Sequence, residues 1–588
     1  MKKSFSIYLF LVCLVAFQSC KKFENEPKDL DTYDIIFDPA DLNAVRAQEF
    51  LNNIYTFLPT GFARVGGDFL DAATDDAVSI VPTASITYYT NGIVSVVNNP
   101  DQYFSNAYFG IRQANIFLAN SAKIPVPAGN PIRTKRFNAE ARFIRAFLYF
   151  QLLQRYGGVP LISDNVFTLN DNLQLKRNTF EECVNYIASE CDAIKPNLYP
   201  DNDSNANNFG RIVQGAAVAL KCRLYLYAAS PLFNGGGIEA DAELKKLTGY
   251  LTIDITRWQK VVDAVAEFKA LGNYYSLQTG AAASGYRNIF INKKNSEVIF
   301  AKQSVNNFDI ENNNAPVGYV GFAAIAGGGR TNPTQNFVDA FTTINGKPIS
   351  QDLKSTTNPN GYDPASPYAN RDPRFYVTVF FSNANTPSAA SYNWLNRAVE
   401  TFEGGRDKPN NNLVTQTRTG YYLRKFMGNF VTGTTYSQQS HNFIYFRYAE
   451  ILLNNAEALN ELGGRTEDAV KEIIEIRRRA GINAGTDARY GIPPGISQAA
   501  MRDIIRNERR IELSFEEHRF FDVRRWKNAN TELNKTLTGM KITREANGSY
   551  THEIVPVVSI TFQDKLYHNP FPYDETVKNS ALRQNFGW

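Results

Sequence analysis

Acidic and basic side chains alternate densely over residues 506–526, RNERRIELSFEEHRFFDVRRW. Carboxylates in such a run could act as catalytic acids, and the guanidinium groups could bind an anion. A glycosidase needs two carboxyl groups roughly 5 to 9.5 Å apart across a bound sugar, and no motif here selects such a pair. Opposite charges three and four positions apart on a helix are typical of ion pairs. We therefore interpret the run as structural and expect no catalytic site. The residues considered as a catalytic or anion-binding set are Glu508, Arg509, Arg510, Glu512, Glu516, Glu517, Asp522, Arg524 and Arg525.

The chain is poor in residues that bind metals or act as general bases. It has four histidines and five cysteines in 588 residues, and no zinc-ligand spacing surrounds His518. We expect no metal and no cofactor. If residues 179–195 form one helix, Cys183 and Cys191 lie about 12 Å apart along it, too far for a disulfide. We therefore interpret these two residues and Cys222 as small buried thiols.

One tryptophan has a sequence context that suits ligand binding. Trp394 lies in SYNWLNR, within a segment rich in Gly, Asn, Pro and Ser. An indole ring on a loop can stack on the apolar face of a pyranose, although loop tryptophans also serve as local plugs. We expect Trp394 to be a ligand platform. The other tryptophans, Trp258, Trp526 and Trp588, are expected to be structural.

The first twenty residues predict secretion followed by acylation. Lys2 and Lys3 precede an apolar run from Phe5 to Phe17, and Ser19-Cys20 follows, which is typical of a signal peptide over residues 1–19. Cys20 resembles the acylated cysteine of a bacterial lipobox, although Phe17 and Gln18 depart from the usual residues. Acyl chains on one cysteine would anchor the protein, since each buried methylene contributes roughly 0.8 kcal/mol. The alternative is an incidental thiol beside an ordinary cleavage site.

The segment after Cys20 is polar and acidic. The composition of residues 20–34 predicts a flexible tether. The segment also resembles the acidic signals that export lipoproteins to the cell surface in Bacteroidota-type bacteria. A solvated linker remains the alternative. The whole chain carries a formal charge of only +4, so the sequence gives no reason to expect nucleic acid as a partner.

Apolar residues recur at helical spacing in several segments. The pattern predicts helices over residues 136–156, 179–195, 209–229, 256–271, 443–462 and 466–480. Three helical hairpins of similar length resemble tetratricopeptide packing, with long insertions between them. Short strands are expected at 297–301 and 375–381. The predicted fold is predominantly α, a tetratricopeptide-like superhelix with a large loop-rich elaboration that carries the strands.

The charged run and five other segments resemble the SusD/RagB family of outer-membrane nutrient-binding lipoproteins. The other segments are TDDA at 74–77, RAFLYFQLLQRYGGVPL at 145–161, TGYYLRKF at 419–426, FRYAEILL at 446–453 and NPFP at 569–572. The last departs from the family's usual residues, as does the closing QNFGW. The resemblance implies a lipid anchor, an outer-membrane location facing the exterior, and a SusC-like TonB-dependent transporter as partner, over which the protein sits as a lid.

The resemblance also suggests further ligand residues and a division of the body. Tyr88 and Tyr89 lie where the family often builds its binding surface, and Tyr286 is a third candidate ring. Asp75, Asn393 and Arg330 could supply hydrogen bonds to hydroxyl groups. We expect an N-terminal helical part at 35–272, a loop-rich ligand-binding elaboration at 273–440, and a C-terminal helical part with the family signature at 441–588.

The function expected is capture of an oligosaccharide at the cell surface and its delivery to the transporter, without catalysis. Three alternatives stay open. The protein could be a structural or gating subunit of the transporter, a relative that binds peptide, or a glycan-degrading enzyme. The sequence identifies neither the glycan nor its linkages.

Overall fold

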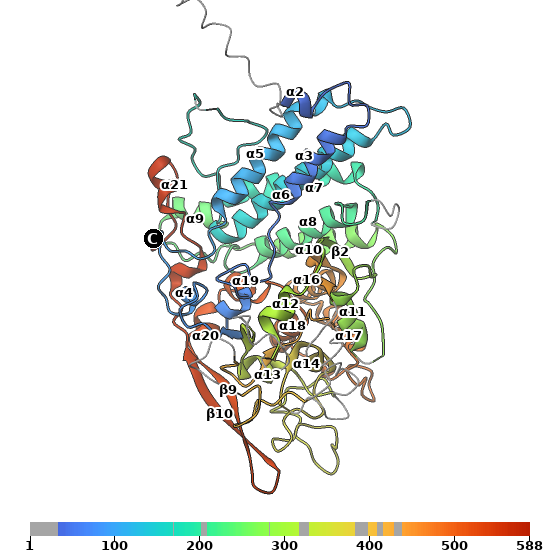
Figure 1. Cartoon of the computed structure of the whole chain (residues 1–588), viewed down its shortest axis with the longest axis vertical. Coiled ribbons are helices and arrows are strands. Elements are labelled where there is room, and N and C mark those ends of the chain that lie inside the picture. Colours follow the sequence, from blue (N-terminus) through green and yellow to red (C-terminus); the bar gives the residue numbers. More distant parts are fainter. Residues whose placement is uncertain are drawn as a thin grey trace, which may run out of the picture.

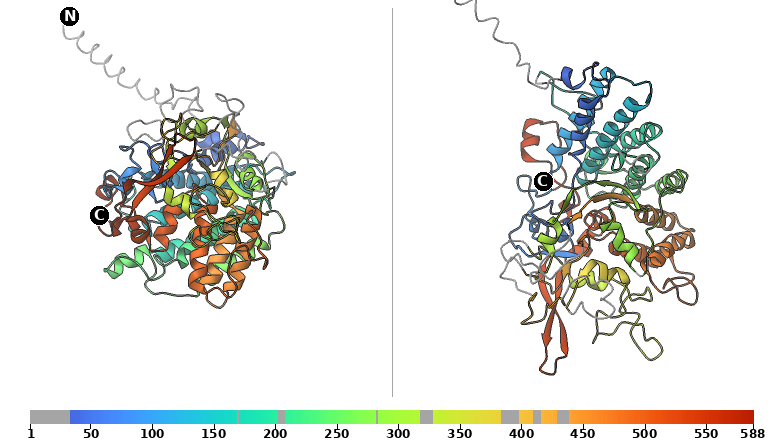
Figure 2. Two further views of the ribbon diagram at one scale, coloured as in Figure 1. Left: turned by 90° about the horizontal axis from the view of Figure 1, so that it is seen from below. Right: turned by 45° about the vertical axis from the view of Figure 1, so that its right-hand side comes forward.

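A stack of antiparallel helices forms one side of the molecule (Figure 1, Figure 2). The computed structural model describes residues 33–168, 170–201, 208–281, 283–316, 328–382, 398–408, 416–428 and 438–588. None of the helices in these ranges is long and apolar enough to cross a membrane. The long helices are α3 (Val45–Tyr55), α5 (Phe104–Asn120), α6 (Arg133–Tyr156), α7 (Phe180–Ile194), α8 (Gln214–Ala229), α10 (Arg257–Lys269), α16 (Tyr448–Glu461), α17 (Thr466–Ala480) and α18 (Gln498–Glu512).

The three predicted hairpins are confirmed as the packed pairs α6–α7, α8–α10 and α16–α17. Local sequence fixes several of their ends. Thr179 and Glu182 form a capping box at the start of α7, while Gly157 and Gly481 end α6 and α17 with positive φ angles of 78° and 86°. The helix-rich fold class is thereby confirmed.

The apolar spacing over residues 136–156 indicates a helix with one apolar face, but α6 is buried on nearly all sides. It lies between α5 and α7. Its polar side chains are therefore paired inside the protein. Arg145 Nη2 lies 3.0 Å from Glu190 Oε2, and Arg155 Nε lies 2.9 Å from Asp101 Oδ2.

Within the described ranges, four two-stranded antiparallel sheets connect segments that are distant in sequence, and a fifth is the hairpin β9–β10. Strand β1 pairs with β4 across about half the chain, and β2 pairs with β8. The pairs are β1 (Ala77–Ser79) with β4 (Thr331–Pro333), β2 (Val298–Lys302) with β8 (Phe443–Arg447), β3 (Asn306–Asn307) with β7 (Gln439–Ser440), β5 (Val379–Phe380) with β6 (Tyr422–Leu423), and β9 (Thr536–Arg544) with β10 (Tyr550–Ser559).

Shorter helices fill the connections between these elements. The α-helices are α2 (Tyr33–Ile36), α4 (Thr87–Thr90), α9 (Ala242–Thr248), α11 (Ser284–Ile291), α12 (Asp309–Asn314), α13 (Gln335–Ala340), α14 (Pro373–Thr378), α19 (Arg519–Arg525), α20 (Ala529–Leu533) and α21 (Tyr573–Lys578). The 3₁₀ helices are η2 (Leu70–Ala73), η3 (Ser121–Lys123), η4 (Lys195–Asn197) and η7 (Asp564–Tyr567).

Two of the predicted elements are corrected. The helix expected over 443–462 begins only at Tyr448, because residues 443–447 pair with β2. The strand expected over 375–381 is confirmed only at 379–380, because Asp372 caps the short helix α14 ahead of it. The strand expected at 297–301 is confirmed as β2, and Cys183, Cys191 and Cys222 are buried free thiols as predicted.

Two large hydrophobic clusters join the parts of the body. The first combines the N-terminal helices with residues of β8 and of the chain after α19. The second combines Phe69 and Ala77 with the elaboration, Phe515 and strand β9. The three-part division of the body stays a prediction, but each cluster draws residues from all three parts.

Candidate ligand-binding site

Three of the residues expected at a ligand surface lie inside the protein. Tyr89, Tyr286 and Asp75 are 2%, 0% and 0% exposed. The Tyr286 hydroxyl donates to the carbonyl of Glu512 at 2.9 Å, and that of Tyr89 to Asn99 Oδ1 at 2.8 Å. This placement corrects the expectation that they present a face to a ligand, because both rings are needed in the core.

Asp75 accepts hydrogen bonds from two arginines of the charged run. Arg510 Nη2 lies 3.0 Å from Asp75 Oδ2, and Arg519 Nε lies 3.0 Å from Oδ1. These guanidinium groups hold the pKa of the carboxyl below its usual range, although burial alone would raise it. The ion pairs of Asp75 therefore link the segment after η2 to α18 and α19, and its carboxylate does not face a ligand.

Tyr88 and Arg330 lie nearer the surface. Tyr88 is half-buried on α4 against the first hydrophobic cluster. Arg330 Nε donates to Asp68 Oδ2 at 3.1 Å and its Nη2 donates to the carbonyl of Gly66. Gly66 also lies close to Ser85, three residues before Tyr88. The turn at Gly66 therefore brings Tyr88 and Arg330 onto neighbouring segments. Trp394, Asn393 and Cys20 lie outside the described residues.

A cleft of about 340 Å³ opens next to Arg330. The backbone N–H of Arg330 donates to the carbonyl of Asn313, which lines this cleft. We call it the Phe62 cleft. Its lining is Thr60, Phe62, Ala63, Phe69, Lys302, Gln303, Ser304, Asn307, Asp309, Ile310, Asn313, Asn314, His441 and Phe443.

Aromatic rings form one wall of the Phe62 cleft. The half-buried ring of Phe62 meets the Phe443 ring edge-on at 5.3 Å between centroids and the Phe69 ring at 5.7 Å. Gly61 permits this packing, since a Cβ there would lie 2.2 Å from the Phe443 ring. Phe62 thus offers an apolar face that its neighbours hold in place.

Amide and hydroxyl groups contribute much of the remaining lining, from the segment around β3 and from α12. Asn307 Nδ2 donates to Ser304 Oγ at 3.1 Å, and Asn313 Nδ2 donates to the carbonyl of Asp309 at 2.7 Å. Asn307 Nδ2 also donates to the carbonyl of Val305, and its Oδ1 accepts the backbone N–H of Asp309. These bonds fix the side chains, and each amide oxygen keeps a lone pair for a further bond. A cleft lined by an aromatic face and several amides suits a ligand rich in hydroxyl groups.

Buried polar contacts hold the walls of the cleft together. Lys302 Nζ donates to the carbonyl of Leu58 at 2.6 Å, and burial lowers its pKa. His441 Nε2 lies 2.8 Å from Glu311 Oε2. A larger groove of about 500 Å³ beside α5 and α21 is lined mainly by apolar residues such as Phe109, so it suits hydroxyl groups less well.

The residues of the Phe62 cleft escaped the sequence analysis. One signal was available: the run NNFDIENNN at 306–314 is unusually rich in amides. The other lining residues of the cleft lie near residues 60 and 441. The pairing of β2 with β8 and of β3 with β7 brings these segments together.

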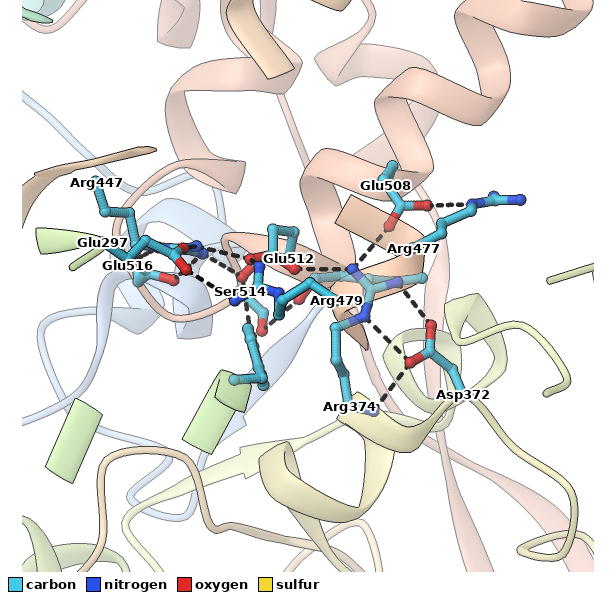
Figure 3. A network of polar contacts seen from close by, with 12 residues as sticks. Glu297, Asp372, Arg374, Arg447, Arg477, Arg479, Glu508, Glu512, Ser514 and Glu516 are labelled. Carbon is cyan, nitrogen blue, oxygen red and sulfur yellow. Dashed lines mark hydrogen bonds and ion pairs between the residues drawn. The ribbon is translucent and has the colours of Figure 1, made fainter. Parts of the chain in front are cut away.

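The charged run forms a buried network, as predicted (Figure 3). Arg447 lies between Glu297, Glu512 and Glu516, with N–O distances of 2.7, 2.6 and 2.8 Å. Arg374 bridges Glu508 and Glu512 at 2.7 and 2.8 Å. Arginine neighbours hold the pKa values of these signature glutamates below their usual range despite burial. They are therefore ionised and enclosed, which is unlike a general acid that must be reached by substrate.

Comparisons with known proteins bear on the family and the fold of this chain. Residues 296–588 match the SusD family, and residues 34–226 match a family described as starch-binding associating with outer membrane. A SusD-like protein, P2, of Formosa agariphila is 25% identical over 84% of this chain and 80% of its own length. A SusD-like protein of Bacteroides fragilis has 27% identity and a TM-score of 0.71, covering 95% of this chain and 99% of its own. Another structure from that species, a SusD-like carbohydrate-binding protein, has 21% identity and a TM-score of 0.67, covering 92% and 98%.

Proposed function

This chain belongs to the SusD family, and on that premise we propose that it is a cell-surface lipoprotein that captures an oligosaccharide and delivers it to a SusC-like TonB-dependent transporter. The Phe62 cleft is the observation that supports capture. The Phe62 ring offers a stacking face for a pyranose, while Gln303, Asn307 and Asn313 offer partners for its hydroxyl groups.

Binding without catalysis is the chemistry that this cleft favours. Its carboxylate among the described lining residues is Asp309, which lies at the exposed start of α12. A glycosidase would need a second carboxyl group facing it across the sugar. Glu311 is the nearest other acid in sequence, but it is buried and paired with His441. The captured sugar would therefore leave unchanged.

The anchor and tether proposed for this chain fit a lid that moves over a partner. Cys20 lies thirteen residues before Tyr33, where the described fold begins. Fully extended, such a segment spans about 45 Å. An acyl group at Cys20 would thus hold the protein at the outer membrane while leaving the body free to rotate away from a transporter.

Calorimetry with a panel of oligosaccharides and peptides tests capture. We expect the chain to bind an oligosaccharide saturably, and Phe62→Leu to weaken this binding about tenfold, because leucine keeps the apolar volume but loses the stacking face. Phe109→Leu is the matched control, since this exposed ring on α5 lies outside the cleft. Saturable binding of peptides alone, or equal effects of both variants, would refute the proposal.

A second experiment separates capture from a purely structural role. Co-purification with the transporter should be normal for Phe62→Leu, because the substitution changes a cleft and not the anchor. A variant that loses the transporter and the sugar together would indicate a subunit whose role is assembly.

A further inference from the structure

A second cavity, of about 350 Å³, shares Gln303 with the Phe62 cleft. Its walls come from the segment before α8, the segment after α10, and the connection between α11 and β2. Residues from these segments include Phe209, Tyr274, Lys293 and Lys294. We call it the Lys293 cavity. Its position next to the cleft means that one extended ligand passing over Gln303 could occupy both.

The Lys293 cavity carries more positive than negative charge. Lys293 and Lys294 both line it and are exposed, while Asp201 is the one carboxylate among its described lining residues. Lys294 Nζ lies 5.0 Å from the centroid of the Phe209 ring, which places one ammonium group beside an aromatic face. Within the part of the chain that the structure describes, Lys293 forms no ion pair. Its charge is therefore available to a ligand.

Aromatic and amide groups accompany these charges. Tyr274 is 44% exposed and Phe209 is half-buried, so both rings present surface at the cavity. Gln303 adds an amide group, whereas the amide of the lining residue Asn295 is occupied by hydrogen bonds within its own loop. Rings suit the apolar face of a sugar, amides its hydroxyl groups, and ammonium groups an anionic substituent.

We propose that the Lys293 cavity is a subsite for an acidic sugar unit, bearing a carboxylate or a sulfate ester, of a glycan that continues into the Phe62 cleft. The inference rests on the proposed function, since it names the class of glycan. The ammonium groups bind the anionic oxygens, and the rings of Phe209 and Tyr274 bind the sugar face. A neutral glycan would leave Lys293 without a partner.

The test measures binding of full-length chain, purified in detergent, to three sets of polysaccharides by affinity electrophoresis and calorimetry. The sets are uronate-containing (polygalacturonate, alginate), sulfated (chondroitin sulfate, carrageenan) and neutral (starch, xylan, laminarin). We expect binding in an acidic set, with an affinity that falls as NaCl is raised. The two acidic sets distinguish carboxylate from sulfate.

The variant Lys293→Gln/Lys294→Gln should weaken binding of the acidic ligand at least tenfold, the size of one charge-assisted hydrogen bond. The control Lys354→Gln/Lys471→Gln removes the same charge from exposed lysines that line neither cavity and should change nothing. Both pairs are on the surface, so the fold should persist.

Each result decides the matter. Preference for neutral glycans, or an acidic affinity that the Lys293 variant leaves unchanged, overturns the acidic subsite and leaves capture intact. Absence of binding to all three sets overturns the proposed capture of an oligosaccharide and this inference with it.

Discussion

Arg447 Nη1 lies 2.6 Å from Glu512 Oε1, and both side chains are enclosed. Arg447 ends β8 immediately before α16, and Glu512 ends α18. Arg447 also reaches Glu297, which precedes β2, and Glu516 beyond α18. One guanidinium group therefore links three segments, and these segments contribute to both hydrophobic clusters.

Arg447→Ala should destabilise the fold by about 3–5 kcal/mol, because it leaves enclosed carboxylates without their counter-charge. Urea denaturation followed by tryptophan fluorescence measures this change. Arg478→Ala is the control: its ion pair with Glu475 is exposed, so its loss should cost less than about 1 kcal/mol. Similar losses for the two variants would contradict the structural role of the network.

Asp75→Asn should likewise lower stability, since Arg510 and Arg519 would lose the carboxylate that they share and would keep only Asp76 and Glu532 as acidic partners. The affinity of the remaining folded protein for its glycan should be unchanged, because Asp75 is enclosed. Denaturation and calorimetry on the same preparation separate the two effects. Normal stability of the variant together with weakened glycan binding would show that Asp75 contacts the ligand after all.

Asp71 should make stability fall as pH rises. Burial and the nearby Asp76 raise its pKa from 3.8 to about 8, while its Oδ1 accepts the backbone N–H of Phe515 at 2.9 Å. The folded state thus holds a proton that the unfolded state releases near pH 4, so this stability is complete below that pH and is lost as pH rises through 8.

Asp71→Asn keeps an acceptor for Phe515 but cannot ionise. Relative to the native chain, the variant should therefore gain stability between pH 5 and pH 9, measured as the urea midpoint at each pH. Parallel pH profiles for the two proteins would show that Asp71 is already ionised in the fold.

Cys20→Ala should move the protein from the membrane to the soluble fraction, because it removes the proposed acylation site. Cell fractionation with immunoblotting measures the distribution. Cys13→Ala is the control, since Cys13 lies within the predicted signal peptide. Unchanged membrane retention of the Cys20 variant would exclude acylation as the anchor.

Local signals accounted for much of the fold. Helix α17 was predicted over its observed span, because Gly463 and Gly464 precede it and Gly481 follows it. The β9–β10 hairpin was missed, although Asn547-Gly548 stands between two segments rich in β-branched residues, which is a hairpin signal. The first turn expected in α16 was lost to strand pairing, which no local pattern specifies.

The binding surface was harder to predict than the helices. By residue type alone, Tyr89 and Tyr286 could be exposed rings that stack on a sugar. In the structure both rings are buried, and their hydroxyl groups donate hydrogen bonds to Asn99 and Glu512. Phe62 is one phenylalanine among 41, and its environment depends on Phe443, nearly 400 residues later. A sequence shows which rings exist, whereas long-range pairing decides which of them are exposed.

The pairing of β1 with β4, Ala77 opposite Pro333, has a consequence for biogenesis. During synthesis the N-terminal segment emerges first, and β1 stays without this strand partner until more than 250 further residues have followed. Protease resistance of nascent chains around β1 should accordingly arise only after residue 333 has been synthesised.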